Sequence, residues 1–206
     1  MEKEYSQNEF IKIIESGKTD STFKVDDLIH LNHDLCNTFK VIDVNHDNTT
    51  NTVDIMPTTQ VATVRFGNAI YKDSSIREWI NGPYIKLFDS DVQDIMADIS
   101  VDSNNEIWFD KAKILSATEI GLIDEDALDN EGKKYPIFES GGWIAKIESR
   151  WISKGNYGST YRYFLRSIKF NLGGAVSDYV WSVDNSCICD ICNYDSTYGV
   201  VPVLRF

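Results

Sequence analysis

The chain of 206 residues has few prolines, cysteines and histidines: four, four and three, respectively. It contains no apolar run near the roughly 20 residues that a membrane-spanning helix needs, so we expect no membrane insertion. Met1–Tyr5 lacks the basic and then apolar pattern of a secretion signal, which favours synthesis and folding in the cytoplasm. In that reducing setting the cysteines are expected to be thiols rather than a disulfide framework.

Positive charge is also scarce. The sequence has 20 Lys and Arg residues and 32 Asp and Glu residues, which gives a net charge of −12 and a pI near 4.6. Such a chain repels phosphate backbones, so nucleic acid is not an expected partner. The hydrophobic share of 42% is ordinary for a globular protein, and the aromatic share of 12% favours a β-rich fold with large rings in its core.

Patterns that indicate catalysis or metal binding are weak. The three histidines lie between residues 30 and 46, and we find no Ser-His-Asp set. Cys187–Cys192 has the pattern Cys-x-Cys-x-x-Cys, but its fourth ligand would have to be Asp190 or Asp195, a poor choice for structural zinc. We therefore expect no metal and no cofactor, and we interpret the many carboxylates as a solvated acidic surface.

The N-terminus carries the signals of a short helix. Ser6–Glu9 has a capping-box pattern, an apolar stripe follows, and Gly17 is placed to end the helix. We assign residues 1–21 to this helix, which could dock on a neighbouring subunit, and residues 22–206 to the main domain.

Short apolar segments separated by polar turns then predict a β-meander. The segments are Thr22–Val25, Leu28–Leu31, Thr38–Val44, Thr52–Met56 and Val61–Phe66.

The polar turn Asp43–Asp54 has two interpretations. Its oxygen-bearing side chains lie where an EF-hand calcium loop has ligands, but Asn48 stands where Gly is expected and Asp54 where a longer Glu would chelate. The alternative is a polar hairpin turn, in which Asn and Asp adopt the left-handed conformation.

Further along, Asp73-Ser74-Ser75 caps a predicted helix, and strands are expected at Ile107–Phe109 and Lys113–Ala117. The β-branched and aromatic residues of the C-terminal segment also predict strands, with Pro202 at a strand start or an edge. The expected core includes Trp79, Leu115, Phe164, Leu165 and Val203.

Five motifs follow one another in the sequence: Phe39–Asp47, the Ser-x-Ile-Arg-x-Trp-Ile-Asn helix at 74–81, the Leu-Ser-x-x-Glu turn at 115–119, the Leu-Arg-Ser strand at 165–167, and Gly-Val-Val-Pro-Val-Leu at 199–204. In this order they resemble an uncharacterised family of Firmicutes and their phages, related to formylglycine-generating enzymes and phage tropism determinants.

This resemblance implies an α+β, C-type lectin-like fold with antiparallel sheets, two short helices and long loops. Cys187 and Cys192 have the Cys-x4-Cys spacing of the copper site in formylglycine-generating enzymes. In those enzymes the pair precedes the motif that corresponds to Leu165-Arg166-Ser167, whereas here it follows. An enzyme of this type, or another metal-dependent enzyme, therefore stands only as the alternative.

The leading hypothesis is a non-enzymatic binding module in a phage virion, either receptor-binding or decorating the head or tail. The resemblance implies that the loop before the last strand recognises the partner, and its Tyr, Asn and Ser content suits recognition. A loop that merely covers the sheet is the alternative. Expected partners are a cell-surface receptor or glycan, neighbouring virion proteins, or a second copy. The expected ligand-binding residues are Asn185, Asp190, Asn193, Tyr194, Ser196 and Tyr198.

Overall fold

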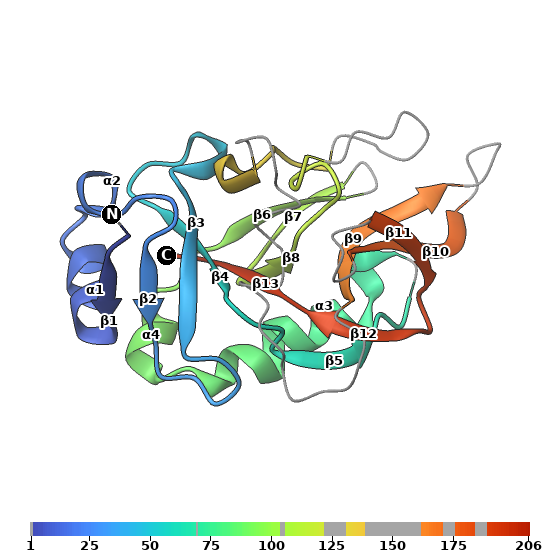
Figure 1. Cartoon of the computed structure of the whole chain (residues 1–206), viewed down its shortest axis with the longest axis horizontal. Helices are drawn as coiled ribbons and strands as arrows, with labels where there is room; N and C mark the ends of the chain where they lie inside the picture. Colours follow the sequence, from blue (N-terminus) through green and yellow to red (C-terminus); the bar gives the residue numbers. More distant parts are fainter. Residues whose placement is uncertain are drawn as a thin grey trace.

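Within the residues that the computed structural model describes, two mixed sheets and a two-stranded ribbon form most of the fold (Figure 1). None of the helices in these parts of the chain has the length and apolar character needed to cross a membrane. The described residues are 2–68, 70–103, 106–121, 131–138, 162–170, 176–183 and 189–206.

The first sheet has six strands in the order β1-β2-β3-β4-β13-β8, and the second has five in the order β11-β10-β9-β12-β5. Strands β6 and β7 pair only with each other among the described strands. The strands are β1 (Glu4–Ser6), β2 (Leu28–His30), β3 (Thr38–Val44), β4 (Val53–Pro57), β5 (Ala62–Arg65), β6 (Ile99–Ser103), β7 (Glu106–Asp110), β8 (Ala112–Ile114), β9 (Tyr163–Phe170), β10 (Val176–Val183), β11 (Cys189–Asn193), β12 (Thr197–Val200) and β13 (Pro202–Arg205).

The helices are short and pack against the sheets, which agrees with the predicted α+β class. The expectation of two helices and antiparallel sheets is wrong, because the described residues form four α-helices and each sheet contains a parallel pair, β1–β2 and β12–β9. A π-helical turn, η3 (Ile80–Tyr84), extends the third helix. The α-helices are α1 (Gln7–Glu15), α2 (Thr19–Thr22), α3 (Ser75–Trp79) and α4 (Ser90–Asp94).

The last strand joins the two sheets. Strand β12 belongs to the second sheet and β13 to the first, with only Val201 between them. Figure 1 shows this crossing, with β13 running from β12 toward the N-terminal half of the molecule. Pro202 is the first residue of β13, as predicted, and the backbone of Phe206 exchanges hydrogen bonds with Val53 at 2.9 and 3.0 Å.

The N-terminal helix has the predicted capping box: the Ser6 amide donates to Glu9 Oε2 at 2.9 Å. Gly17 follows the last turn with φ +62°, the left-handed conformation that ends helices. Phe10 is fully buried, and its ring meets that of Phe206 edge-on at 5.0 Å. The apolar face of α1 thus packs on the chain's own core.

The core prediction is confirmed for Leu115, Phe164, Leu165 and Val203, each at most 2% exposed. Trp79, which was also predicted to be mostly buried, is partly buried and packs against the core.

The structure also corrects two secondary-structure predictions. Thr22–Val25 is not a strand, because Thr22 ends α2 and the chain then turns. Cys189–Asn193, expected to be part of a loop, forms β11 and pairs with β10 over its whole length.

Candidate binding surfaces

Two of the sequence motifs meet in the interior. Arg166 from the Leu-Arg-Ser strand forms a bidentate ion pair with Glu119 from the Leu-Ser-x-x-Glu turn, at 2.6 Å (Nη1–Oε2) and 2.9 Å (Nη2–Oε1). Both side chains are fully buried. Lys113 Nζ donates to the same carboxylate at 2.7 Å. Burial by itself would raise the pKa of Glu119, but the two cations more than offset this and lower it to about 2.

A second buried carboxylate lies beside this pair. Glu131 accepts hydrogen bonds from the hydroxyls of Ser103 and Ser167, and its backbone carbonyl accepts from Arg166 Nη2 at 3.0 Å. Burial raises the pKa of Glu131, and the nearby Arg166 charge opposes this only in part. The cluster therefore holds together β6, β8 and β9 with the turn at Glu119.

The arginine of the Ser-x-Ile-Arg-x-Trp-Ile-Asn helix also pairs with a carboxylate. Arg77 in α3 holds Asp110 at the end of β7 with two hydrogen bonds, 2.7 Å from Nε and 2.8 Å from Nη2. Asp110 also accepts from Trp108 Nε1 at 2.8 Å, and the Arg77 guanidinium lies 5.4 Å from the Trp108 ring centroid. These contacts fix the β6–β7 ribbon to α3.

The turn Asp43–Asp54 is closed by buried ion pairs. Arg205 donates to Asp54 at 2.7 and 2.8 Å, and Tyr135 donates to the same carboxylate at 2.9 Å. His46 lies 2.6 Å from Asp43 and stacks on Tyr135 with centroids 3.8 Å apart.

Several Asn and Asp residues of the turn have positive φ, as the hairpin interpretation predicts. Two of the carboxylates that the calcium interpretation would need, those of Asp43 and Asp54, are engaged within the protein. In the described parts of the chain, no three His, Cys, Asp or Glu side chains are placed to hold a metal ion.

The prediction of a solvated acidic surface is wrong for these carboxylates. Glu119, Asp54 and Glu131 are at most 4% exposed, and the arginine partners of the first two lie 47 and 151 residues away in sequence. That separation leaves no local signal in the sequence that could reveal the pairs with arginine.

The six predicted ligand-binding residues do not form one loop. Asn185 lies outside the described residues, and Asp190 lies in β11. The other four lie at the end of the second sheet: Asn193 ends β11, Tyr194 and Ser196 form a turn, and Tyr198 lies in β12. All four are half-buried.

Contacts hold this C-terminal turn in place. Asn193 Oδ1 accepts from the Asp195 amide at 2.8 Å, and the Asn193 carbonyl accepts from the Ser196 amide at 2.9 Å. The Tyr194 amide donates to the Asp178 backbone carbonyl at 3.2 Å, and the Tyr194 carbonyl accepts from the Gly67 amide at 3.2 Å.

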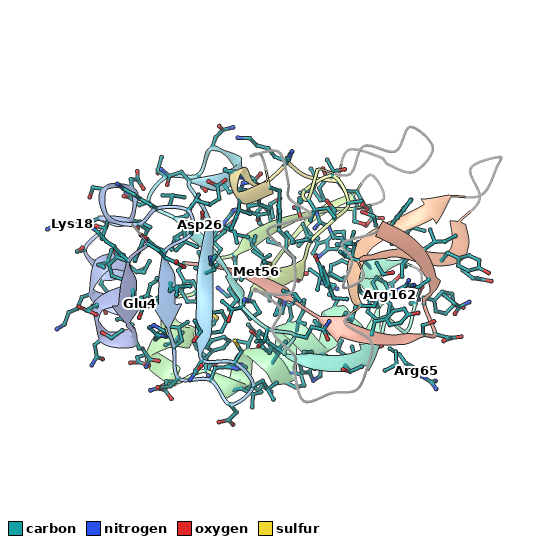
Figure 2. All side chains as sticks on the ribbon, in the orientation of Figure 1. Glu4, Lys18, Asp26, Met56, Arg65 and Arg162 are labelled. Atoms are coloured by element: carbon teal, nitrogen blue, oxygen red, sulfur yellow. The ribbon has the colours of Figure 1, made fainter. Side chains whose placement is uncertain are left out.

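The ring of Tyr198 lies against Phe164 at 5.2 Å, and the Arg162 guanidinium lies 5.4 Å from its centroid. Arg65 and Arg162 both lie at this end of the molecule (Figure 2). The turn is therefore an ordered surface with tyrosine and arginine side chains.

Two of the thiols lie in the described residues with their side chains. Cys36 is buried and donates to the Thr38 carbonyl at 3.1 Å, and Cys192 is buried with its thiol 3.5 Å from the Val180 carbonyl. Cys192 acts as a small apolar residue of the core, so it is not displayed on a loop.

The sequence did not identify the outward face of the β6–β7 ribbon. Ile107 and Phe109 are 68% and 67% exposed, the most exposed large apolar side chains among the described residues. Trp108 between them faces the other way, toward a cavity of about 190 Å³. The sequence does contain a signal for this exposed face. Ile107, Trp108 and Phe109 are three consecutive large apolar residues, and a strand directs successive side chains to opposite faces. The cavity is lined by Ile70, Lys72, Asp73, Ser103, Glu106 and Trp108.

A family model described as "Domain of unknown function (DUF6273)" matches residues 46–205, a span that includes the ion pairs of Glu119, Asp110 and Asp54. Comparisons with curated proteins and with solved structures give no match.

Proposed function

The chain belongs to the DUF6273 family, and from this premise we propose that it is a non-enzymatic binding module. Its recognition surface is the C-terminal turn, with Tyr194, Ser196 and Tyr198 as the contacting residues. The observation that carries the proposal is the defined conformation of this turn. Its two tyrosines are half-exposed, but hydrogen bonds hold their backbone and packing holds their rings.

A defined conformation favours binding because the ordering of side chains and loops at an interface costs conformational entropy. A pre-organised surface has already lost this entropy on folding. Tyrosine offers a large contact area with few rotatable bonds, and it is common among the residues that dominate binding energy. The turn also carries the exposed Asp195 and Thr197, which can donate or accept hydrogen bonds around the aromatic anchors.

The motif residues support a binding role in another way. Three charged side chains of the motifs are those of Arg77, Arg166 and Glu119. Each of them forms an ion pair within the protein. These ion pairs hold the fold together. We therefore assign recognition to the turn, which this scaffold presents at the surface.

We propose further that the scaffold is a C-type lectin-like domain within the α+β class. The setting we propose is a phage virion, in which the module contacts a host receptor or glycan, or decorates the head or tail. The turn would then face outward, away from the α1 end of the molecule.

The test is binding of the fluorescently labelled domain to a microarray of bacterial surface glycans and to host cells. We expect discrete binding that the variant Tyr194→Ser with Ser196→Ala loses by about tenfold or more, because it removes one anchor and one hydroxyl. Immunoblotting of purified phage particles tests the virion setting.

Leu35→Ser provides the matched control, since Leu35 is also surface-exposed, at 37%, but lies in the segment between β2 and β3. It should bind as the unmodified protein does. Equal binding by the Tyr194 variant and the unmodified protein would reject the turn as the recognition surface.

A further inference from the structure

The loop between β2 and β3, residues 31–37, is attached to a helical segment through His33, which is only 9% exposed. The backbone of His33 forms an antiparallel bridge with Phe88. Its ring lies 4.2 Å from that of Phe88 and 4.7 Å from that of Tyr84, measured between centroids. Tyr84 ends η3, and Phe88 follows η4 (Ile85–Leu87). The histidine therefore holds the β2–β3 loop against these helical turns.

The hydrogen bonds of the His33 ring determine where its proton lies. Nδ1 accepts from the amides of Leu35 at 3.2 Å and Cys36 at 3.3 Å, so it carries no proton of its own. Nε2 lies 3.4 Å from the Tyr84 carbonyl, which can only accept, so Nε2 carries the proton. Only the neutral ring satisfies these contacts, since a proton on Nδ1 would face two amide protons.

Burial makes the charged form of this ring unfavourable. It lowers the pKa of His33 below the ordinary value of 6.5, and the Tyr84 carbonyl and the Asp34 carboxylate oppose this only in part. The neutral ring therefore stabilises the closed loop. This contribution is complete above about pH 6.5 and is lost as the pH falls through the lower folded pKa.

The other titratable groups around the ring do not reverse this effect. The Cys36 thiol and the Tyr84 phenol are uncharged in their acid forms, so they add no charge as the pH falls. Asp89, just before α4, is exposed and accepts from Gln7 at 2.9 Å and from Asn32 at 3.0 Å. These two side chains lower the pKa of Asp89, so it stays ionised in mild acid.

The closed loop also leaves one buried polar group without a partner. The hydroxyl of Tyr84 is fully buried and has no hydrogen-bond partner in the part of the chain that the structure describes. Such a group costs stability, and it regains its hydrogen bonds when water reaches it. Movement of the loop would hydrate this hydroxyl and expose Cys36, whose thiol donates to the Thr38 carbonyl at 3.1 Å. The hydration offsets part of the cost of opening.

We propose that His33 is an acid-sensitive latch of the β2–β3 loop. When its ring is neutral, it accepts from the amides of Leu35 and Cys36, and the loop is closed on the helical turns. When Nδ1 takes up a proton, neither amide retains its acceptor and the buried ring is charged. The loop then opens and exposes the rings of Tyr84 and Phe88.

This latch is a regulatory feature beyond the proposed binding function, because it lies outside the C-terminal turn. His33 precedes residues 46–205, which the family model matches, whereas Tyr84 and Phe88 lie within that span. The pH therefore controls a contact between the N-terminal segment and the family domain.

NMR of the full chain labelled with ¹⁵N tests the tautomer and its titration, from about pH 8 to about pH 4. We expect a neutral His33 ring with its proton on Nε2 at the upper end, and a second proton on Nδ1 as the pH falls. The amide signals of Leu35 and Cys36 should shift with the same midpoint. The proposal is overturned by a ring that carries its proton on Nδ1 at about pH 8, or by one that stays neutral down to about pH 4.

The rate at which dithiodipyridine modifies Cys36 measures the opening. Peptide mass spectrometry locates the modification, and the rate is divided by that in urea at the same pH, which removes the intrinsic pH dependence of a thiol. We expect this relative rate to rise about tenfold or more between about pH 8 and about pH 4, because two hydrogen bonds are lost. Cys192 is the internal reference: it is 4% exposed in the second sheet, and its relative rate should not change.

His33→Asn is the matched variant. An Asn side chain can accept from the amides two and three residues further on, as Nδ1 does here, but it does not titrate. Cys36 should then stay protected at both pH values. His30→Asn is the control, because the His30 side chain is 43% exposed and lies outside the latch. In this control the relative rate of Cys36 should rise in acid as in the unmodified protein.

Three labelling results would also overturn the proposal. Equal relative rates for Cys36 at the two pH values would show that the loop does not open. A parallel rise for Cys192 would replace local opening by global unfolding. An acid response in His33→Asn equal to that of the unmodified protein would assign the response to another group. If His33→Asn does not fold, the titration and the two cysteine rates of the unmodified protein still decide.

Discussion

Glu119 and Arg166 lie 47 residues apart in sequence and form a bidentate ion pair with no exposure to solvent. The pair joins the turn after β8 to strand β9, and Lys113 completes it at 2.7 Å. Two cations share one carboxylate, so the loss of that carboxylate leaves two buried positive charges without a direct anionic partner. Stability should therefore depend more on Glu119 than on any exposed acid.

Glu119→Gln should lower the free energy of unfolding by about 3–5 kcal/mol, the range seen when one partner of a buried pair is removed. Urea denaturation at pH 7 measures this. Lys72→Met is the control, because Lys72 and Glu106 form an exposed pair at 2.5 Å, and such pairs contribute about 0–1 kcal/mol. Equal losses in the two variants would contradict the role of burial.

The same carboxylate predicts a pH dependence. The pKa of Glu119 is about 2 in the folded protein, below its ordinary value of 4.5, so the ionised form stabilises the fold. This stabilisation is complete above about pH 4.5 and is lost as the pH falls toward 2. Its full size is roughly 3 kcal/mol, at 1.36 kcal/mol for each pH unit.

Glu131 acts in the opposite direction. Its pKa is raised by burial, so its contribution to stability is present at low pH and is lost as the pH rises through the folded pKa.

The urea midpoint of the unmodified protein should fall between pH 5 and pH 2, because Glu119 is protonated there. The midpoint of Glu119→Gln should fall less, because this variant lacks the ionisable carboxyl. An equal slope in both proteins would show that other carboxyls cause the acid sensitivity.

Phe164→Ala should cost about 3–5 kcal/mol of unfolding free energy. Phe164 is 1% exposed and contacts the rings of Phe66 at 5.3 Å and Tyr198 at 5.2 Å, so its removal leaves a cavity between β9 and its neighbours. An unchanged urea midpoint would contradict the packing of β9 in the core.

Removal of calcium should leave the melting temperature unchanged. The carboxylates of Asp43 and Asp54 already have His46 and Arg205 as partners, and a ligand can raise the melting temperature only by binding the folded state. Differential scanning fluorimetry with EDTA and with added calcium measures this. A rise of several degrees with calcium would restore the calcium-loop interpretation.

Local patterns predicted the elements whose signals are short-range. The capping box at Ser6, the stop at Gly17 and the strand Thr38–Val44 all appear as predicted, because each depends on residues that are neighbours in sequence. The ion pairs of Glu119 and Asp54 could not be predicted this way, since chain topology alone brings their partners close.

The segment before the last strand shows a different kind of error. If its cysteines are counted as polar, the segment has too few regularly spaced apolar residues for a buried strand, which predicts a loop. Cys192 is buried like a small hydrophobic residue, and with it β11 has enough apolar character to pair with β10. The proposed recognition surface is consequently shorter than the predicted loop.

The last prediction concerns the stability of that surface. The sequence alone predicts that Asn193, Tyr194 and Tyr198 can be replaced by Ala together at little cost. The contacts now predict otherwise for two of them, because Asn193 Oδ1 accepts the Asp195 amide and Tyr198 packs on Phe164.

Asn193→Ala should cost about 1 kcal/mol through the lost hydrogen bond, and Tyr198→Ala about 2–4 kcal/mol through lost packing. Ser196→Ala, in contrast, should stay within about 0.5 kcal/mol, as is usual at surface sites. Urea denaturation of the three single variants checks this order. If Tyr198→Ala were as stable as Ser196→Ala, the ring would contribute nothing to the fold and the turn would lack the pre-organisation on which its proposed binding role depends.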